Sequence, residues 1–89
     1  MKTVRKDIRK TCGNEYKYEL IIHKSEMPPL YSIKIELTMK NGKHTKAETH
    51  ELPLDEKDAI SFFEKLVDNL ATPINLPYII DDELKEHVL

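Results

Sequence analysis

The sequence YSIKIELTM, residues 31–39, alternates apolar and polar side chains without interruption, and this alternation decides the fold. In an extended chain the apolar side chains at odd positions fall on one face and the polar ones on the other. A run of this kind that is rich in β-branched residues predicts a half-buried strand of an antiparallel sheet. The remaining elements can be placed relative to this strand.

A second strand is predicted just before it, over residues 16–24, where two tyrosines, a leucine and an isoleucine share one parity. Residues 25–29 form the connecting loop, because the two prolines at its end cannot donate to a strand ladder. Shifting the pairing of the two strands by two residues would set like charges opposite each other. The predicted pairs are Ile22–Tyr31, Leu20–Ile33, Glu19–Lys34 and Lys17–Glu36.

An Asn-Gly dipeptide marks a second hairpin, which leads into a strand over residues 44–52. A two-residue turn would pair Ile35 with Glu48 and bring charge onto the apolar face. A three-residue loop, 40–42, with its glycine left-handed in a bulge, avoids this conflict. The predicted pairs are Leu37–Thr45, Ile35–Ala47, Ile33–Thr49, Glu36–Lys46 and Lys34–Glu48.

The opposite face of this sheet then carries two rows of alternating charge. Each opposed pair contributes about 0.2 to 1 kcal/mol, so we interpret these charges as determinants of the register and not as a binding patch. The two rows are Lys17/Glu36/Lys46 and Glu19/Lys34/Glu48.

Two helices are predicted after the strands. Residues 55–71 have the periodicity of an amphipathic helix, with Asp55 as N-cap and an end near Ala71, because the following threonine precedes a proline. Residues 76–88 form a second, short helix with Pro77 in its first turn. The apolar face predicted for the first helix consists of Ala59, Ile60, Phe62, Phe63, Leu66, Val67 and Leu70.

These elements predict a single α+β domain over residues 1–89: a three- or four-stranded antiparallel meander with one face covered by the two helices. Residues 1–14 fit either a basic edge strand or an arm, since the spacing of Val4 and Ile8 matches both the helical and the strand period. A chain of 89 residues has room for one domain. The tyrosines at 16, 18 and 31 share the parity of the apolar residues, so we expect them in the core.

Composition indicates a cytoplasmic protein. The single cysteine, Cys12, cannot form an internal disulfide, and residues 1–8 lack the apolar segment of a signal peptide. No apolar run approaches the roughly 20 residues that cross a bilayer, so no membrane association is expected.

Charge is distributed unevenly along the chain. Residues 1–46 contain eleven basic and five acidic residues, a net charge of +6, whereas residues 47–89 contain three and eleven, a net charge of −8. The first ten residues hold five of the basic side chains and a single acidic one, Asp7. Such a segment can contact an acidic protein partner or nucleic acid. The candidate contact residues are Lys2, Arg5, Lys6, Arg9 and Lys10.

Most of the chain resembles a family of short uncharacterised proteins found in Clostridia and related Firmicutes. The chain differs from the family pattern at Ser32, where a glycine is usual, and at Asn75, where a histidine is usual. The resemblance implies no activity, because that family has no known function. The motifs that carry it are Tyr16-Lys17-Tyr18-Glu19-Leu20, Leu30-Tyr31-Ser32-Ile33, Thr72-Pro73-Ile74-Asn75-Leu76 and Ile79-Ile80-Asp81-Asp82-Glu83-Leu84.

No catalytic, cofactor-binding or metal site is predicted. The four histidines (23, 44, 50 and 87) lack the spacing of zinc ligands, and residues 81–83 are consecutive acidic positions outside any calcium loop. With two glycines the chain cannot hold a glycine-rich nucleotide-binding fingerprint. Cys12 is interpreted as an incidental thiol, because no base can be placed beside it.

Three function classes follow, in decreasing order of support. The first is a small protein-interaction or regulatory module, with a protein partner or a second copy of the chain in a homodimer. The second is a nucleic-acid-binding accessory protein that uses the basic first ten residues. An enzyme comes third.

Overall fold

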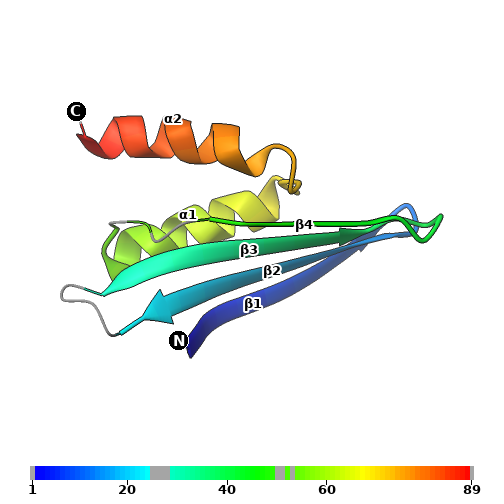
Figure 1. Ribbon diagram of the computed structural model, residues 1–89, viewed down its shortest axis with the longest axis horizontal. Helices are drawn as coiled ribbons and strands as arrows, with labels where there is room; N and C mark the ends of the chain where they lie inside the picture. Colours follow the sequence, from blue (N-terminus) through cyan, green and yellow to red (C-terminus); the bar gives the residue numbers. More distant parts are fainter. Residues whose placement is uncertain (1, 25–28, 50–51, 53, 89) are drawn as a thin grey trace.

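Four strands precede two helices along the chain (Figure 1). The computed structural model describes residues 2–24, 29–49, 52 and 54–88, with side chains to residue 82. The strands form one antiparallel sheet in the order β1-β2-β3-β4, so each strand pairs with its neighbours in sequence. The elements are β1 (Lys2–Thr11), β2 (Asn14–His23), β3 (Leu30–Thr38), β4 (His44–Glu48), α1 (Glu56–Asp68) and α2 (Leu76–Val88).

The predicted register of the central strands is confirmed. In β2 and β3, Leu20 pairs with Ile33, and in β3 and β4, Ile35 pairs with Ala47. The charged pairs of the opposite face, such as Glu36 with Lys46, follow from the same register. Charge and apolar parity therefore specify the same alignment of three strands.

The loop between β3 and β4 is the predicted three-residue loop. The N–H group of Met39 donates to the carbonyl oxygen of Lys43 at 2.7 Å, which closes the loop around residues 40–42. Gly42 has a φ of +89°, and a Cβ added there would meet nothing within 4 Å, so a left-handed backbone is the one demand on this residue. The turn chemistry inferred from the Asn-Gly dipeptide is correct.

Residues 2–11 form an edge strand and not a free arm. A two-residue turn joins β1 to β2, and both of its residues, Cys12 and Gly13, have positive φ, of 52° and 82°. This is the mirror-image turn that matches the twist of a hairpin. The register shifts between Thr3 and Arg5, where an irregularity of the bulge type bends the strand.

The two hairpin turns lie side by side at one end of the sheet, beyond the helices (Figure 1). Oδ1 of Asn14 accepts a hydrogen bond of 3.0 Å from the Lys40 N–H group, and a Cβ on Gly13 would lie 2.9 Å from the Lys40 side chain. Cys12 is exposed at this tip. The hydrogen bond fastens one turn to the other between the neighbouring strands β2 and β3.

Helix α1 begins as predicted and ends earlier. The Asp55 side chain accepts a hydrogen bond of 2.8 Å from the Asp58 N–H group, as an N-cap does. The predicted end near Ala71 is wrong: α1 stops at Asp68 and Asn69 is its C-cap. Leu70, expected on the buried face, has a φ of +50° and is 37% exposed, because its left-handed backbone turns it out of the helix.

The core lies between the sheet and the helices, as the apolar parity predicts. Helix α1 packs on β1 and β2, and Leu76 of α2 is buried in the same cluster. Tyr18 and Tyr31 are buried and Tyr16 is half-buried, which confirms their assignment to the core. The largest members of the core are Tyr18, Leu20, Ile33, Ile35, Phe62, Leu66 and Leu76.

Two details of the sheet differ from the prediction. The last strand ends at Glu48 and not at residue 52, although Leu52 makes an isolated bridge with Tyr31; residues 50, 51 and 53 lie outside the described part, as do 25–28 of the predicted loop. Ile21 and Ser32 are buried on the charged face, where parity alone predicts exposure. They oppose each other in adjacent strands, so each covers part of the other.

Helix α2 has the predicted bounds, with Pro77 in its first turn. Within the described residues, no helix is both long and apolar enough to cross a membrane.

Candidate functional site

The five basic residues of the first segment all lie on β1, and they are exposed. The register places Arg5 and Arg9 on the helix-covered face, since they pair with Leu20 and Tyr16. The residues next to them in sequence, Lys6 and Lys10, point to the open face. The sheet therefore brings the predicted contact residues to one edge and divides them between its two faces.

Arg9 and Lys10 already have acidic partners. The Arg9 guanidinium lies 3.4 Å from the Asp7 carboxylate and 3.9 Å from that of Asp68 in α1, and Lys10 Nζ lies 3.7 Å from Glu15. These pairs are exposed, so each contributes less than about 1 kcal/mol. Among the described residues no carboxylate pairs with Lys2, Arg5 or Lys6, which leaves their charge available to a partner.

The main chain of β1 is open along one side, because β2 is its one neighbour in the described sheet. In a hairpin closed by a two-residue turn, the residues that flank the turn exchange hydrogen bonds, and every second residue along the strand does the same. Thr11 and Asn14 flank this turn. The main-chain N–H and C=O groups that point away from β2 are therefore those of Lys6, Ile8 and Lys10.

One of these outward groups has a partner within its own strand. The N–H group of Ile8 donates a hydrogen bond of 2.8 Å to Oδ1 of Asp7, whose other oxygen contacts Arg9. The Asp7 carboxylate thus occupies the position where a carbonyl oxygen of an added strand would bind. A charge held at a free edge in this way protects the edge against indiscriminate pairing.

A shallow pocket of about 270 Å³ lies between β1 and α1, on the helix-covered side of this edge. Its apolar part comes from Phe63 and Val67, and its charged rim includes Arg9 and Asp68. The pocket is large enough for one side chain of a bound segment.

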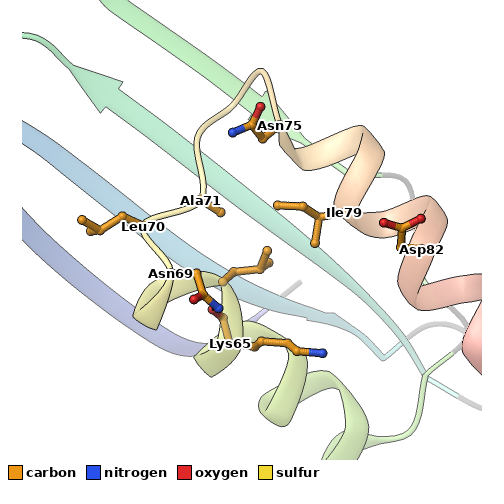
Figure 2. Close-up of a pocket in the computed structure, with 8 residues that line it drawn as sticks. Lys65, Asn69, Leu70, Ala71, Asn75, Ile79 and Asp82 are labelled. Atoms are coloured by element: carbon orange, nitrogen blue, oxygen red, sulfur yellow. The ribbon is translucent and has the colours of Figure 1, made fainter.

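A second pocket, of about 430 Å³, lies between the end of α1 and the start of α2 (Figure 2). Ile79 points into the gap between the helices, whereas Leu70 points away from α2 (Figure 2). The charged residues of its lining, Lys65 and Asp82, are of opposite sign. The lining therefore favours no particular charge in a ligand.

The open face of the sheet carries an ion cluster centred on Glu36. Its carboxylate lies 3.3 Å from Lys34 Nζ in the same strand and 3.4 Å from His44 Nε2 in β4. The Lys34 hydrogen bond, helped by His44, holds the pKa of the Glu36 carboxyl below its ordinary value despite partial burial. The closest charged contacts of Glu36 therefore run along its strand and diagonally, and not to the directly opposed lysines.

A histidine and a serine meet on the same open face of the sheet. His23 Nε2 lies 2.9 Å from Ser32 Oγ. Ser32 is only 2% exposed, so a substrate cannot reach its hydroxyl group. Sequence reasoning missed this contact, because its signal is the register that places β2 beside β3.

The other residues considered from sequence are dispersed. The described residues contain no group of three or more histidine, cysteine or acidic side chains that could hold a metal ion. His44 is exposed on the charged face, Asp81 and Asp82 are exposed on α2, and Cys12 is exposed in its turn. The side chains of Glu83 and His87, and all of His50, lie outside the described part.

Comparison with known families agrees with the kind of family that the motifs indicate. Residues 1–86 match a family of unknown function, DUF6514. The chain belongs to the DUF6514 family. The match includes the whole of β1, so the basic edge lies within the part of the chain that the DUF6514 pattern describes. No curated protein and no solved structure shows significant similarity to this DUF6514 chain.

Proposed function

We propose that this chain is a small protein-interaction module, without catalytic activity or cofactor of its own, that binds an acidic protein partner along β1. The observation that carries the proposal is the ten-residue edge strand, which combines open main-chain groups with five basic residues and one acidic residue. Opposite charge accelerates association and selects the partner. A cytoplasmic location and an origin in Clostridia and related Firmicutes belong to the same proposal, on the strength of the lone cysteine and the shared motifs.

The arrangement of the basic residues supports a protein partner over nucleic acid. Arg5 and Arg9 lie on one face and Lys6 and Lys10 on the other, so they do not form a single patch that could follow a phosphate backbone. The three tyrosines of the described sheet lie on the helix-covered face, which leaves no tyrosine, phenylalanine or tryptophan of β1–β4 on the open face to stack on bases.

A second copy of the chain is the alternative protein partner. Its helical half is acidic, and β4 offers a second free edge of five residues. Pairing two copies of β1 is disfavoured, because each strand carries a net charge of +4 from five basic residues and one acidic residue. The oligomeric state therefore distinguishes the two kinds of partner.

The proposal is tested by affinity capture from native extract, with and without nuclease. Two double variants are compared with the unmodified chain: Lys6→Gln/Lys10→Gln in β1, and the matched control Lys43→Gln/Lys46→Gln, which removes the same charge elsewhere. We expect a partner with an acidic segment that nuclease does not release, that the β1 variant loses and that the control retains. Capture abolished by nuclease would contradict the proposal, as would a salt-resistant dimer in light scattering that retains no other protein.

A further inference from the structure

We infer that the partner segment adds to β1 as a fifth strand, and that it carries the pattern acidic–any–apolar–any–acidic. This inference rests on the proposed function and specifies its partner and its mode of binding. Addition of a strand to an exposed edge uses main-chain hydrogen bonds for affinity and alternate side chains for specificity. The structure gives both sets of groups for β1.

The main-chain groups define which residues of the partner face β1. The outward groups of β1 belong to Lys6, Ile8 and Lys10, so in an antiparallel fifth strand the partner residues directly opposite these three exchange hydrogen bonds with them. Side chains of directly opposed residues lie on the same face of a sheet. Three alternate partner side chains therefore lie beside Lys6, Ile8 and Lys10 on the open face.

The side chains on the open face set the chemistry of those three positions. Ile8 is 48% exposed and lies between Lys6 and Lys10 at a spacing of two residues in each direction. Carboxylates opposite the two lysines and an apolar side chain opposite Ile8 form three complementary pairs at once. The same apolar pair covers an isoleucine that the described structure leaves half-exposed.

The helix-covered face restricts the two intervening positions. One of them lies opposite Asp7 and the other opposite Arg9, which contacts both Asp7 and Asp68. An acidic residue opposite Asp7 would meet like charge, and Arg9 already lies beside two carboxylates, whereas Lys10 lies beside one, that of Glu15, among the described residues. The carboxylates of the partner are therefore favoured on the open face, and small polar residues suit the other two positions.

Asp7 makes binding selective. Its carboxylate accepts the Ile8 N–H group at 2.8 Å, so an incoming carbonyl oxygen must displace it. A segment that offers only main-chain hydrogen bonds replaces the Asp7 carboxylate by its own carbonyl oxygen as the acceptor of the Ile8 N–H group, so the number of hydrogen bonds at this N–H group does not change. A segment with carboxylates opposite Lys6 and Lys10 gains interactions that Asp7 cannot supply, since Asp7 lies on the other face.

Three short peptides with serine at both ends test this inference. The first carries Glu-Thr-Val-Thr-Glu, which in the antiparallel alignment sets the two glutamates opposite Lys6 and Lys10 and the valine opposite Ile8. The second has the same composition in the order Thr-Glu-Val-Glu-Thr. The third repeats the first with an N-methyl group on valine, which removes the hydrogen-bond donor opposite Ile8 and keeps every charge. Binding is measured by calorimetry, and the amide groups of β1 are followed by NMR.

We expect the first peptide to bind best, the reordered peptide about fivefold to tenfold weaker through loss of two charged pairs, and the N-methylated one about tenfold weaker or more. Amide exchange of Lys6 and Lys10 should slow when the first peptide binds. Asp7→Ala should tighten binding about fivefold, because the Ile8 N–H group is released. Lys6→Gln/Lys10→Gln should weaken it, and Lys43→Gln/Lys46→Gln should leave it unchanged, with both variants folded by circular dichroism.

Equal binding of all three peptides would overturn strand addition and leave the acidic partner of the proposed function intact. Failure of every acidic peptide, together with retention of an RNA oligonucleotide or formation of a dimer, would overturn both.

Discussion

The hydroxyl group of Tyr18 joins two distant parts of the chain. It donates a hydrogen bond of 2.9 Å to the carbonyl oxygen of Ala71, which lies in the connection between α1 and α2. Both residues are buried, so the carbonyl group depends on this hydroxyl for its hydrogen bond. Burial, followed by the neighbouring Tyr16, raises the pKa of Tyr18 to about 12.

Replacing Tyr18 by phenylalanine should reduce the free energy of unfolding by about 1 to 3 kcal/mol, because the Ala71 carbonyl group is left buried without a partner. Urea denaturation measures the loss. Tyr16→Phe is the matched control: Tyr16 stacks on Tyr18 at 6.4 Å between ring centroids, and its hydroxyl group has no hydrogen bond to any described residue. Equal losses in the two variants would contradict the role given to the Ala71 hydrogen bond.

The same hydroxyl group predicts a loss of stability in alkali. In the unfolded chain Tyr18 titrates at its ordinary pKa of 10.0, whereas in the fold it titrates at about 12. Its contribution is therefore complete below pH 10 and disappears as the pH rises toward 12. Urea midpoints measured at pH 8, 10 and 11 should fall less steeply for Tyr18→Phe than for the unmodified chain; parallel curves would show that other groups control the loss.

At the scale of the elements, the end of α1 has a capping motif with an unusual residue. The N–H group of Ala71 donates to the Leu66 carbonyl oxygen at 3.0 Å, and that of Leu70 donates to Val67 at 3.1 Å. These two bonds define a Schellman motif, in which the residue with positive φ is usually glycine. Here it is Leu70, which carries a backbone cost of about 1 to 2 kcal/mol and exposes part of its side chain.

Leu70→Gly should therefore raise the free energy of unfolding by about 1 kcal/mol relative to Leu70→Ala, which removes the same exposed side chain and keeps the strained backbone. Thermal denaturation of the two variants makes the comparison. An alanine variant as stable as the glycine variant would mean that this position is not strained in solution.

Phe63 tests the packing of α1 on the sheet. It is buried in the core, so Phe63→Ala should cost about 3 to 5 kcal/mol and lower the Tm by well over 10 °C. Ser61→Ala, at an exposed position of the same helix, is the control. A Tm that Phe63→Ala leaves unchanged would show that α1 does not pack there.

The elements that were predictable are those in which two independent signals agree. The alternation of apolar residues and the pairing of opposite charges both select the register in which Leu20 lies opposite Ile33. In the loop before β4, the turn preference of the Asn-Gly dipeptide agrees with the same alternation. Whether residues 2–11 form a strand could not be decided from the sequence, because charged residues on both faces of β1 obscure the alternation of a strand. The turn that follows was not recognisable either, because a cysteine with positive φ, such as Cys12, is rare. The candidate site was predictable only as a set of charges: the roles of Asp7 and Ile8 depend on which main-chain groups point outward, and this follows from the turn.

The whole molecule is elongated, and the two edge strands of its described sheet differ in length: β1 has ten residues and β4 has five. The basic half of the chain supplies the sheet, and within the described residues one ion pair, Arg9 with Asp68, joins β1 to the acidic helix α1. Asp68 is 73% exposed, so mutual attraction of the halves adds little to stability. Most of the charge on β1 therefore faces solvent.

Hydrogen exchange across the whole sheet should show this edge directly. Without a partner, the amides of Lys6 and Lys10 should exchange rapidly, whereas those of Asp7 and Arg9, which bond to β2, should be protected. The central strands β2 and β3 should exchange slowest. Uniform protection along β1 would indicate that the edge is already covered. Protection of Lys6 and Lys10 with rapid exchange of Asp7 and Arg9 would show that the outward groups are assigned wrongly.

The position of Cys12 has a practical consequence for chemical labelling. It is the single cysteine of the chain, and it projects from the hairpin tip at the far end of the sheet from the start of β1 and from the end of α2 (Figure 1). A maleimide-linked nitroxide or fluorophore would therefore attach at one defined place without any substitution. Because the tip continues directly into β1, such a probe reports on occupancy of that edge, while affinity tags at the termini remain remote from the tip.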